Sequence, residues 1–329
     1  MTITRRNLII TAAVLVVPCL TDHVMAQDAA TFPGKPVRIV MPYQAGVPFD
    51  TYLRGMAPRL ASELGQTFVI ENKPGAGANI GTEQVARSPA DGYTLLAYGV
   101  NLTANVSLFK KLNYDPVKDF TPVIGLIRNP GILIVPPNSP FKTMADLITH
   151  ARANPGTLSY ASGGNGSMAH FCGESLKSAA GIDILHVPYR GAPDVLASLY
   201  GGQTQLSCPV FPSALEQIRS GRLRALAVTS PRRMPQLPDV PTMHEVLGSR
   251  GFDIEADNGI VAPTGTPRAI VTKLHQAFAK VLSDPAVSGP IIAAGYEVLS
   301  TRPEEVSARI AKDIATYREV VRISGMQPD

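Results

Sequence analysis

Three glycine- and serine-rich turns carry the residues of this chain that could do chemistry. Residues 162–167 read Ser-Gly-Gly-Asn-Gly-Ser, follow a strand-like run and precede a helical pattern. Residues 189–193, Tyr-Arg-Gly-Ala-Pro, repeat this arrangement, and residues 44–46, Gln-Ala-Gly, precede a helical pattern near Asp50. Backbone N–H groups left free at a helix N-terminus, together with the helix dipole, attract anions. The turns therefore predict a site for a carboxylate or another anion, with Arg190 as a charge partner.

Residues that could support catalysis are not arranged for it. Gly166-Ser167 has no glycine two residues on, so the nucleophile elbow is missing. The glycines of residues 75–77 and Gly81 follow the pattern GxGxxxG, one residue longer than the turn that binds dinucleotides. We interpret His186 as a hydrogen-bonded strand residue and His170 as a packing or orienting residue on a helix. The pattern favours a binding protein, with an exported α/β enzyme as the alternative.

Metal and cofactor sites are not expected. No CxxC motif, no HExxH motif and no closely spaced group of His and Cys occurs in the sequence. Cys172 and Cys208 are isolated and have apolar neighbours, so we interpret them as two buried thiols. Pairing of these two cysteines in an oxidising compartment is the alternative.

The elements that must position the three turns alternate between strand and helix. The first unit has predicted strands at 37–41, 67–70 and 93–97 and predicted helices at 51–64 and 80–86. Such a βαβαβ order is typical of a mainly parallel sheet that is covered by helices. Asp50 is the predicted N-cap of the first helix.

A strand–turn–helix unit then occurs twice, once from residue 132 and again from residue 259. Thr266 is the predicted N-cap of the later helix, and a Thr301/Glu304 capping box is expected to open a final helix up to Val321. The repetition predicts an α/β fold with two lobes, two crossovers between them and a central cleft, which is a common place for a ligand. The predicted parts are lobe I at 32–127, lobe II at 128–248 and the rest of lobe I at 249–329.

Composition and the first residues indicate an exported globular protein. Hydrophobic residues make up 45% of the 329 residues, and the net charge of +4 forms no basic patch, which argues against binding to nucleic acid. Residues 1–26 have the pattern of a signal peptide, with Arg5 and Arg6 before an apolar run and small residues before a cut at Gln27. We expect Sec export to the periplasm, and the arginine pair leaves the twin-arginine route open. A retained anchor is the alternative, which the shortness of the apolar run disfavours.

Several segments resemble one family across the chain from residue 32 onward. They include Glu-Asn-Lys-Pro-Gly-Ala-Gly-Ala-Asn-Ile-Gly at 71–81 and Pro-Ala-Asp-Gly-Tyr-Thr-Leu-Leu at 89–96. The other matching segments are 114–120, 160–167, 186–191, 223–229, 238–242 and 262–267. The chain resembles the solute receptors of the tripartite tricarboxylate transporter group, the Bug family of periplasmic binding proteins.

The resemblance implies a type II periplasmic-binding-protein fold that closes on a small organic acid and catalyses no reaction. In the family, main-chain groups of the turn that falls on Asn165, Gly166 and Ser167 hold one ligand carboxylate. The loop that falls on residues 45–50 reaches the other end of the ligand, partly through waters. We expect a monomer that delivers a small carboxylate to the membrane subunits of a tripartite tricarboxylate-type transporter. A receptor that reports to a signalling partner is the alternative.

Two departures from the family pattern bear on the ligand. Val47, Pro48 and Phe49 replace small residues in the first loop, and residues 207–211, Ser-Cys-Pro-Val-Phe, lack an Asp-Asn pair that many relatives carry. Without that carboxylate an amino-acid ligand is disfavoured, so we expect an apolar or aromatic carboxylate, with Tyr43, Phe49 or Tyr98 against its body. The candidate ligand-binding residues are Tyr43, Gln44, Ala45, Gly46, Phe49, Asp50, Tyr98, Asn101, Ser162, Asn165, Gly166, Ser167, Tyr189, Arg190, Cys208 and Asn258.

Overall fold

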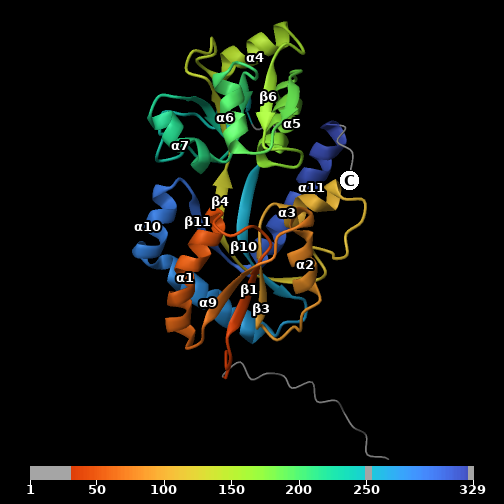
Figure 1. Ribbon diagram of the computed structural model, residues 1–329, viewed down its shortest axis with the longest axis vertical. Coiled ribbons are helices and arrows are strands. Elements are labelled where there is room, and N and C mark those ends of the chain that lie inside the picture. Colours follow the sequence, from red (N-terminus) through yellow and green to blue (C-terminus); the bar gives the residue numbers. More distant parts are fainter. Residues whose placement is uncertain (1–30, 249–253, 325–329) are drawn as a thin grey trace, which may run out of the picture.

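Two sheets, one in each lobe, organise the computed structural model, which describes residues 31–248 and 254–324 (Figure 1). This two-lobed α/β architecture confirms the predicted fold class. The signal peptide expected at residues 1–26 lies outside the described residues. Within the described ranges, no helix has the length and apolar character needed to cross a membrane.

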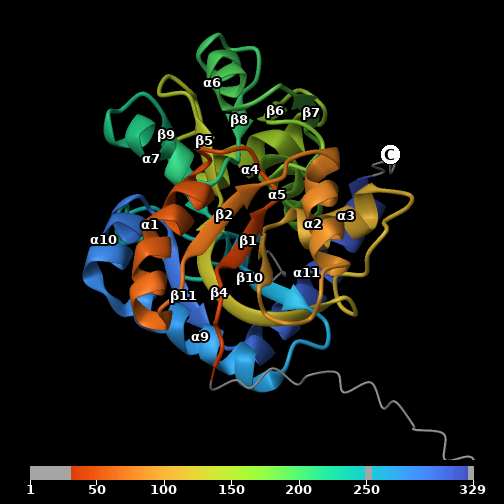
Figure 2. The ribbon, with the colours of Figure 1, turned by 60° about the horizontal axis from the view of Figure 1, so that its bottom comes forward.

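The lobe I sheet has six strands in the order β11-β4-β10-β3-β1-β2. β1 pairs in parallel with β2 and β3, as the βαβαβ pattern predicts, whereas β10 is antiparallel to β3 and β4. Figure 2 shows α1 and α9 on one face of the sheet and α2, α3 and α11 on the other. The strands are β1 Val37–Met41, β2 Phe68–Asn72, β3 Thr94–Tyr98, β4 Phe120–Pro130, β10 Glu255–Pro263 and β11 Glu297–Thr301, and the helices are α1 Pro48–Leu64, α2 Asn79–Ala86, α3 Asn101–Leu108, α9 Arg268–Ser283, α10 Pro285–Ala293 and α11 Pro303–Ser324.

The lobe II sheet has five strands in the order β7-β6-β8-β5-β9. β6 is parallel to both β7 and β8, so the carboxyl ends of these three strands share one edge of the sheet. The helices that follow these strands, α5, α6 and α7, therefore begin near one another. The strands are β5 Ile132–Val135, β6 Ser159–Ser162, β7 Leu185–Pro188, β8 Leu206–Ser207 and β9 Arg224–Val228, and the helices are α4 Met144–Ala153, α5 Met168–Ala180, α6 Ala192–Tyr200, α7 Phe211–Arg219 and α8 Met243–Leu247.

Two connections and one long helix join the lobes. The chain enters lobe II through β4 and β5 and returns along β10, which is paired with β4. The first half of α11 packs in the core of lobe I through Ile310, and its second half reaches the core of lobe II. There the Tyr317 ring lies 4.4 Å from the ring of Phe171 on α5. The helix α11 thus belongs to both lobes (Figure 1).

Three predicted helix starts are wrong. Helix α1 begins at Pro48 with Val47 as N-cap, because a proline suits the first helical position, so Asp50 lies inside the first turn. Helix α9 begins at Arg268, and the hydroxyl of Thr266 donates to the carbonyl of Pro263 instead of capping it. Helix α11 begins at Pro303, and Thr301 is the last residue of β11 instead of the helix cap. The backbone N–H of Arg302 donates to the carboxylate of Glu305, which replaces Glu304 in the expected role.

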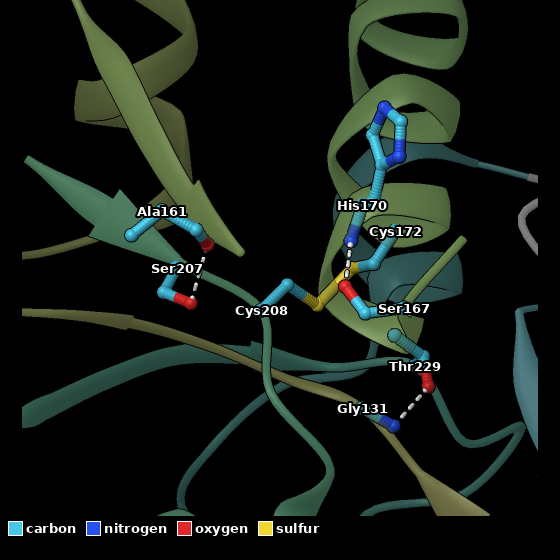
Figure 3. Close-up of a disulfide and its surroundings, with 8 residues drawn as sticks. All are labelled: Gly131, Ala161, Ser167, His170, Cys172, Ser207, Cys208 and Thr229. Atoms are coloured by element: carbon cyan, nitrogen blue, oxygen red, sulfur yellow. Dashed lines mark hydrogen bonds between the residues drawn. A yellow bond between two sulfur atoms is a disulfide. The ribbon is translucent and has the colours of Figure 1, made fainter. Parts of the chain in front are cut away.

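Cys172 and Cys208 form a disulfide, so the interpretation of two buried thiols is wrong. Their Cα atoms lie 6.0 Å apart although 36 residues separate them in the sequence. The bridge joins α5 to the segment directly after β8 (Figure 3). Parallel pairing of β6 with β8 brings these segments together, and the local sequence around each cysteine carries no trace of that pairing.

Candidate ligand-binding site

The turn at residues 162–167 in lobe II is held from behind by side chains. The Ser162 hydroxyl accepts the N–H of Gly164 at 3.1 Å and lies 2.6 Å from Nε2 of His186. Ser167 caps α5, since its hydroxyl accepts the backbone N–H of His170 at 3.3 Å. The N–H of Gly166 donates to Nδ1 of the same histidine at 3.1 Å. The shape of the turn is therefore fixed without a ligand.

Two backbone donors of this turn are available to an anion. Among the described residues, no acceptor pairs with the N–H groups of Gly163 and Asn165, and the latter residue is exposed. The turn faces lobe I, because a Cβ added to Gly166 would lie 2.5 Å from a methyl carbon of Leu108 on α3. Gly166 also has a φ of 74°, which favours glycine. The geometry suits a carboxylate at the N-terminus of α5.

A pair of histidines supports the turn. The rings of His170 and His186 stack with their centroids 3.8 Å apart, and Tyr160 stacks on the second ring at 4.9 Å. Burial lowers the pKa of His170 to about 3, and the neighbouring charges of His186 and Lys177 act in the same direction. His170 is thus neutral at neutral pH, and its Nδ1 can accept from Gly166. This arrangement matches the interpretation of both histidines as structural residues.

The facing loop of lobe I is held by a carboxylate. Asp50 is 1% exposed and accepts from Gly46 N–H at 2.9 Å, Arg54 Nε at 3.0 Å and Asn72 Nδ2 at 2.9 Å. Although burial alone would raise the pKa of the Asp50 carboxyl, these hydrogen bonds lower it below its ordinary value. Gln44 and its two successors are exposed above this carboxylate. Asp50 therefore positions the loop from beneath.

The structure has one hollow between the lobes and another within lobe II. A groove of about 380 Å³ runs between the lobes, with Pro48 and Tyr52 of lobe I on one side and Val210 and Ser213 of lobe II on the other. A second chamber of about 220 Å³ lies within lobe II and reaches Ser167. The two hollows share Val210 and Ser213 as lining residues. A ligand could thus contact the anion-binding turn and both lobes at once.

Of the candidate residues only Ser167 lines one of the two hollows, and the others lie elsewhere in the two lobes. In lobe I the Tyr43 hydroxyl donates to the side chain of Asn101 at 3.3 Å. In lobe II Tyr189 donates its N–H to the carbonyl of Ser162 at 2.9 Å, and Arg190 is exposed. Asn258 lies on the crossover strand β10, where its amide donates to the carbonyl of Tyr98.

Three residues that we expected at the ligand have buried side chains. Phe49 is 6% exposed and packs in the lobe I core, because the early start of α1 turns it inward. Tyr98 is also buried in lobe I, and Cys208 is buried in the disulfide. The sequence analysis did not identify the apolar residues that line the lobe II chamber. Only Pro209 and Val210 stood out, as part of the segment that departs from the family pattern.

Comparison with known proteins connects this geometry to a family. A model of the tripartite tricarboxylate transporter family receptor matches residues 52–326. Protein BugT of Bordetella pertussis is 34% identical over 300 residues, which cover 91% of this chain and 92% of BugT. The structure of periplasmic binding protein BugD is 35% identical with a TM-score of 0.73, and that of R. palustris Rpa4515 with adipate is 34% identical with a TM-score of 0.76. Each covers 91% of this chain, and each of those chains is covered completely.

Proposed function

The chain belongs to the family of tripartite tricarboxylate transporter receptors, which are periplasmic solute-binding receptors, and we propose that it binds a small carboxylate between its two lobes. The observation that carries this proposal is the turn at residues 162–167, which has free N–H groups just before the N-terminus of α5 and lies against Leu108 of lobe I. The related Rpa4515, with its bound adipate, supports a carboxylate as the ligand.

Both lobes would contact the ligand. The α5 N-terminus supplies backbone donors and a favourable dipole for a carboxylate. The Gly46 loop, held by Asp50, would cover the ligand from lobe I when the lobes close. Closure of this kind removes the ligand from water and strengthens the hydrogen bonds to its carboxylate.

Delivery and export complete the proposal. A closed, ligand-loaded receptor would present both lobes to the membrane subunits of a tripartite tricarboxylate-type transporter, and we expect it to do so as a monomer. Residues 1–26 would direct the chain to the periplasm as a signal peptide.

A thermal-shift screen against mono- and dicarboxylates, amides and amino acids tests the function. A ligand that binds only the folded protein raises the melting temperature. Gly166→Ala should abolish the carboxylate shift, because the added methyl group strains the turn and meets Leu108. Gly181→Ala is the matched control at the other end of α5, where φ is 61° and the space is open. Equal shifts in both variants, or no shift with any carboxylate, would contradict the proposal.

A further inference from the structure

The lobe II chamber is walled by apolar side chains from three helix starts. Met168 comes from α5, Val195 and Leu196 come from α6, and Val210 and Ala214 lie at the start of α7. None of its lining residues has an ionisable side chain. The chamber reaches the anion-binding turn at Gly163 and Ser167, so a carboxylate held there has an apolar space directly beside it.

Two side-chain hydroxyls of the chamber are already used by the protein. The Ser207 hydroxyl donates to the carbonyl of Ala161 at 2.8 Å (Figure 3). The Ser213 hydroxyl donates to the carbonyl of Val210 at 2.7 Å. Pro209, at the same wall, has no N–H to offer. A charged group deep inside the chamber would therefore find no side chain of opposite charge and no free hydroxyl at Ser207 or Ser213, which is costly for a buried ion.

From these contacts we propose that the chamber receives the hydrocarbon body of a monocarboxylate whose carboxylate binds at the turn of residues 163–167. This inference rests on the proposed function and adds the class of substrate. The volume of about 220 Å³ lies below the range of about 300–1,000 Å³ typical of pockets for drug-sized ligands, so the body is small. The specificity comes from lobe II and not from Phe49 or Tyr98 of lobe I, which are buried in their own core.

Hexanoate and adipate form the sharpest pair of probes, because they share a six-carbon chain and differ in the second carboxylate. Calorimetric titration of the protein, freed of endogenous ligand by unfolding and refolding with the disulfide intact, gives both dissociation constants. We expect hexanoate to bind at least about tenfold more tightly, because the second carboxylate of adipate would find no side chain of opposite charge in the chamber.

Two alanines of α6 provide a variant and its matched control. Ala192 lines the chamber and is exposed, so Ala192→Leu fills the space without disturbing the core. Ala197 is exposed on the same helix but does not line the chamber. Ala192→Leu should weaken hexanoate binding at least about tenfold, and Ala197→Leu should leave it unchanged, with circular dichroism checking that both fold.

The outcomes separate this inference from the proposed function. Tighter binding of hexanoate that is lost only in Ala192→Leu supports the chamber. Three results would overturn the proposed role of the chamber and leave the receptor function standing. These are tighter binding of adipate than of hexanoate, wild-type affinity for hexanoate in Ala192→Leu, and binding of other carboxylates but not of hexanoate. Failure of every carboxylate to bind would overturn both.

Discussion

In lobe I an ionised carboxylate holds the loop that faces the cleft, whereas in lobe II neutral side chains hold the facing turn. Asp50 gathers one backbone and two side-chain donors beneath Gly46. In lobe II the same task falls to hydroxyl groups and to the imidazole of His170, with a disulfide beside them. The two halves of one ligand site therefore depend on different chemistry, and they should respond differently to redox conditions and pH.

The disulfide is expected to give the largest difference between the lobes. Cys172→Ala/Cys208→Ala should lower the free energy of unfolding by about 2–4 kcal/mol, because the bridge closes a loop of 36 residues in lobe II. Urea unfolding of the wild type with and without dithiothreitol should show the same loss. The double variant is its own control, since the reductant should not change its midpoint. An unchanged wild-type midpoint under reduction would contradict the prediction.

The histidine pair should make lobe II sensitive to mild acid. Unfolded histidine takes up a proton below about pH 6.5, whereas the pKa of folded His170 is about 3. The free energy of unfolding should therefore fall as the pH drops from about 6.5 toward 3, by about 2 kcal/mol at pH 5. Urea unfolding at pH 7 and pH 5 measures this loss.

His170→Asn keeps an acceptor for the N–H of Gly166 and removes the titration. Its stability should change less between pH 7 and pH 5 than that of the wild type. His150→Asn, at an exposed histidine on α4 of the same lobe, is the control and should keep the wild-type dependence. The same loss of stability between pH 7 and pH 5 in all three proteins would show that His170 does not cause the acid sensitivity.

The carboxylate of Asp50 in lobe I should contribute less to the free energy of unfolding than the histidine of lobe II. Its contribution should also change in a different pH range. Asp50→Asn should cost about 1–2 kcal/mol, because the hydrogen bonds from Arg54 and Gly46 lose their ionised acceptor. Since the pKa of the folded carboxyl is lowered, its contribution is present above about pH 4 and is lost as the pH falls below that value. Glu63 lies on the same helix as Asp50 and forms an exposed ion pair with Lys280 of α9, so Glu63→Gln should cost at most about 0.5 kcal/mol in the same urea titrations. Equal losses of unfolding free energy in the two variants would show that Asp50 does not hold the loop of lobe I.

Much of the fold could be predicted because its signals are local. The mainly apolar run of β1 indicates a strand, and the glycines and serines before α5 indicate an anion-binding turn. The edge strand β11 was missed, because its residues are only partly buried and carry no strong alternation. Helix starts went wrong where a proline or a neighbouring carboxylate competed with the expected cap.

The chamber and the disulfide could not be predicted in the same way. Met168, Leu196 and Val210 lie on separate helix starts, and only the order of the lobe II strands brings them together. The direction of Phe49 depends on the start of α1 at Pro48, three residues before Thr51, the first residue of the expected helix. Tertiary pairing decides such features, and a single sequence does not encode that pairing locally.

The smallest expected effect compares one tyrosine from each lobe. The hydroxyl of Tyr160 in lobe II donates to a carboxylate oxygen of Glu174 at 2.6 Å, whereas that of Tyr43 in lobe I donates to the neutral Asn101 at 3.3 Å. Hydrogen bonds to charged groups contribute about 1.5–3 kcal/mol and neutral ones about 0.5–1.5 kcal/mol.

Tyr160→Phe should therefore cost about 1 kcal/mol more than Tyr43→Phe in urea unfolding at pH 7. Both substitutions remove one buried hydroxyl and keep the ring, so each serves as the control for the other. The Tyr160 variant leaves Glu174 with Lys177, which lies 3.2 Å away and limits the loss. A larger cost for Tyr43→Phe would reverse the comparison, because lobe I would then depend more strongly on a neutral hydrogen bond than lobe II does on a charged one.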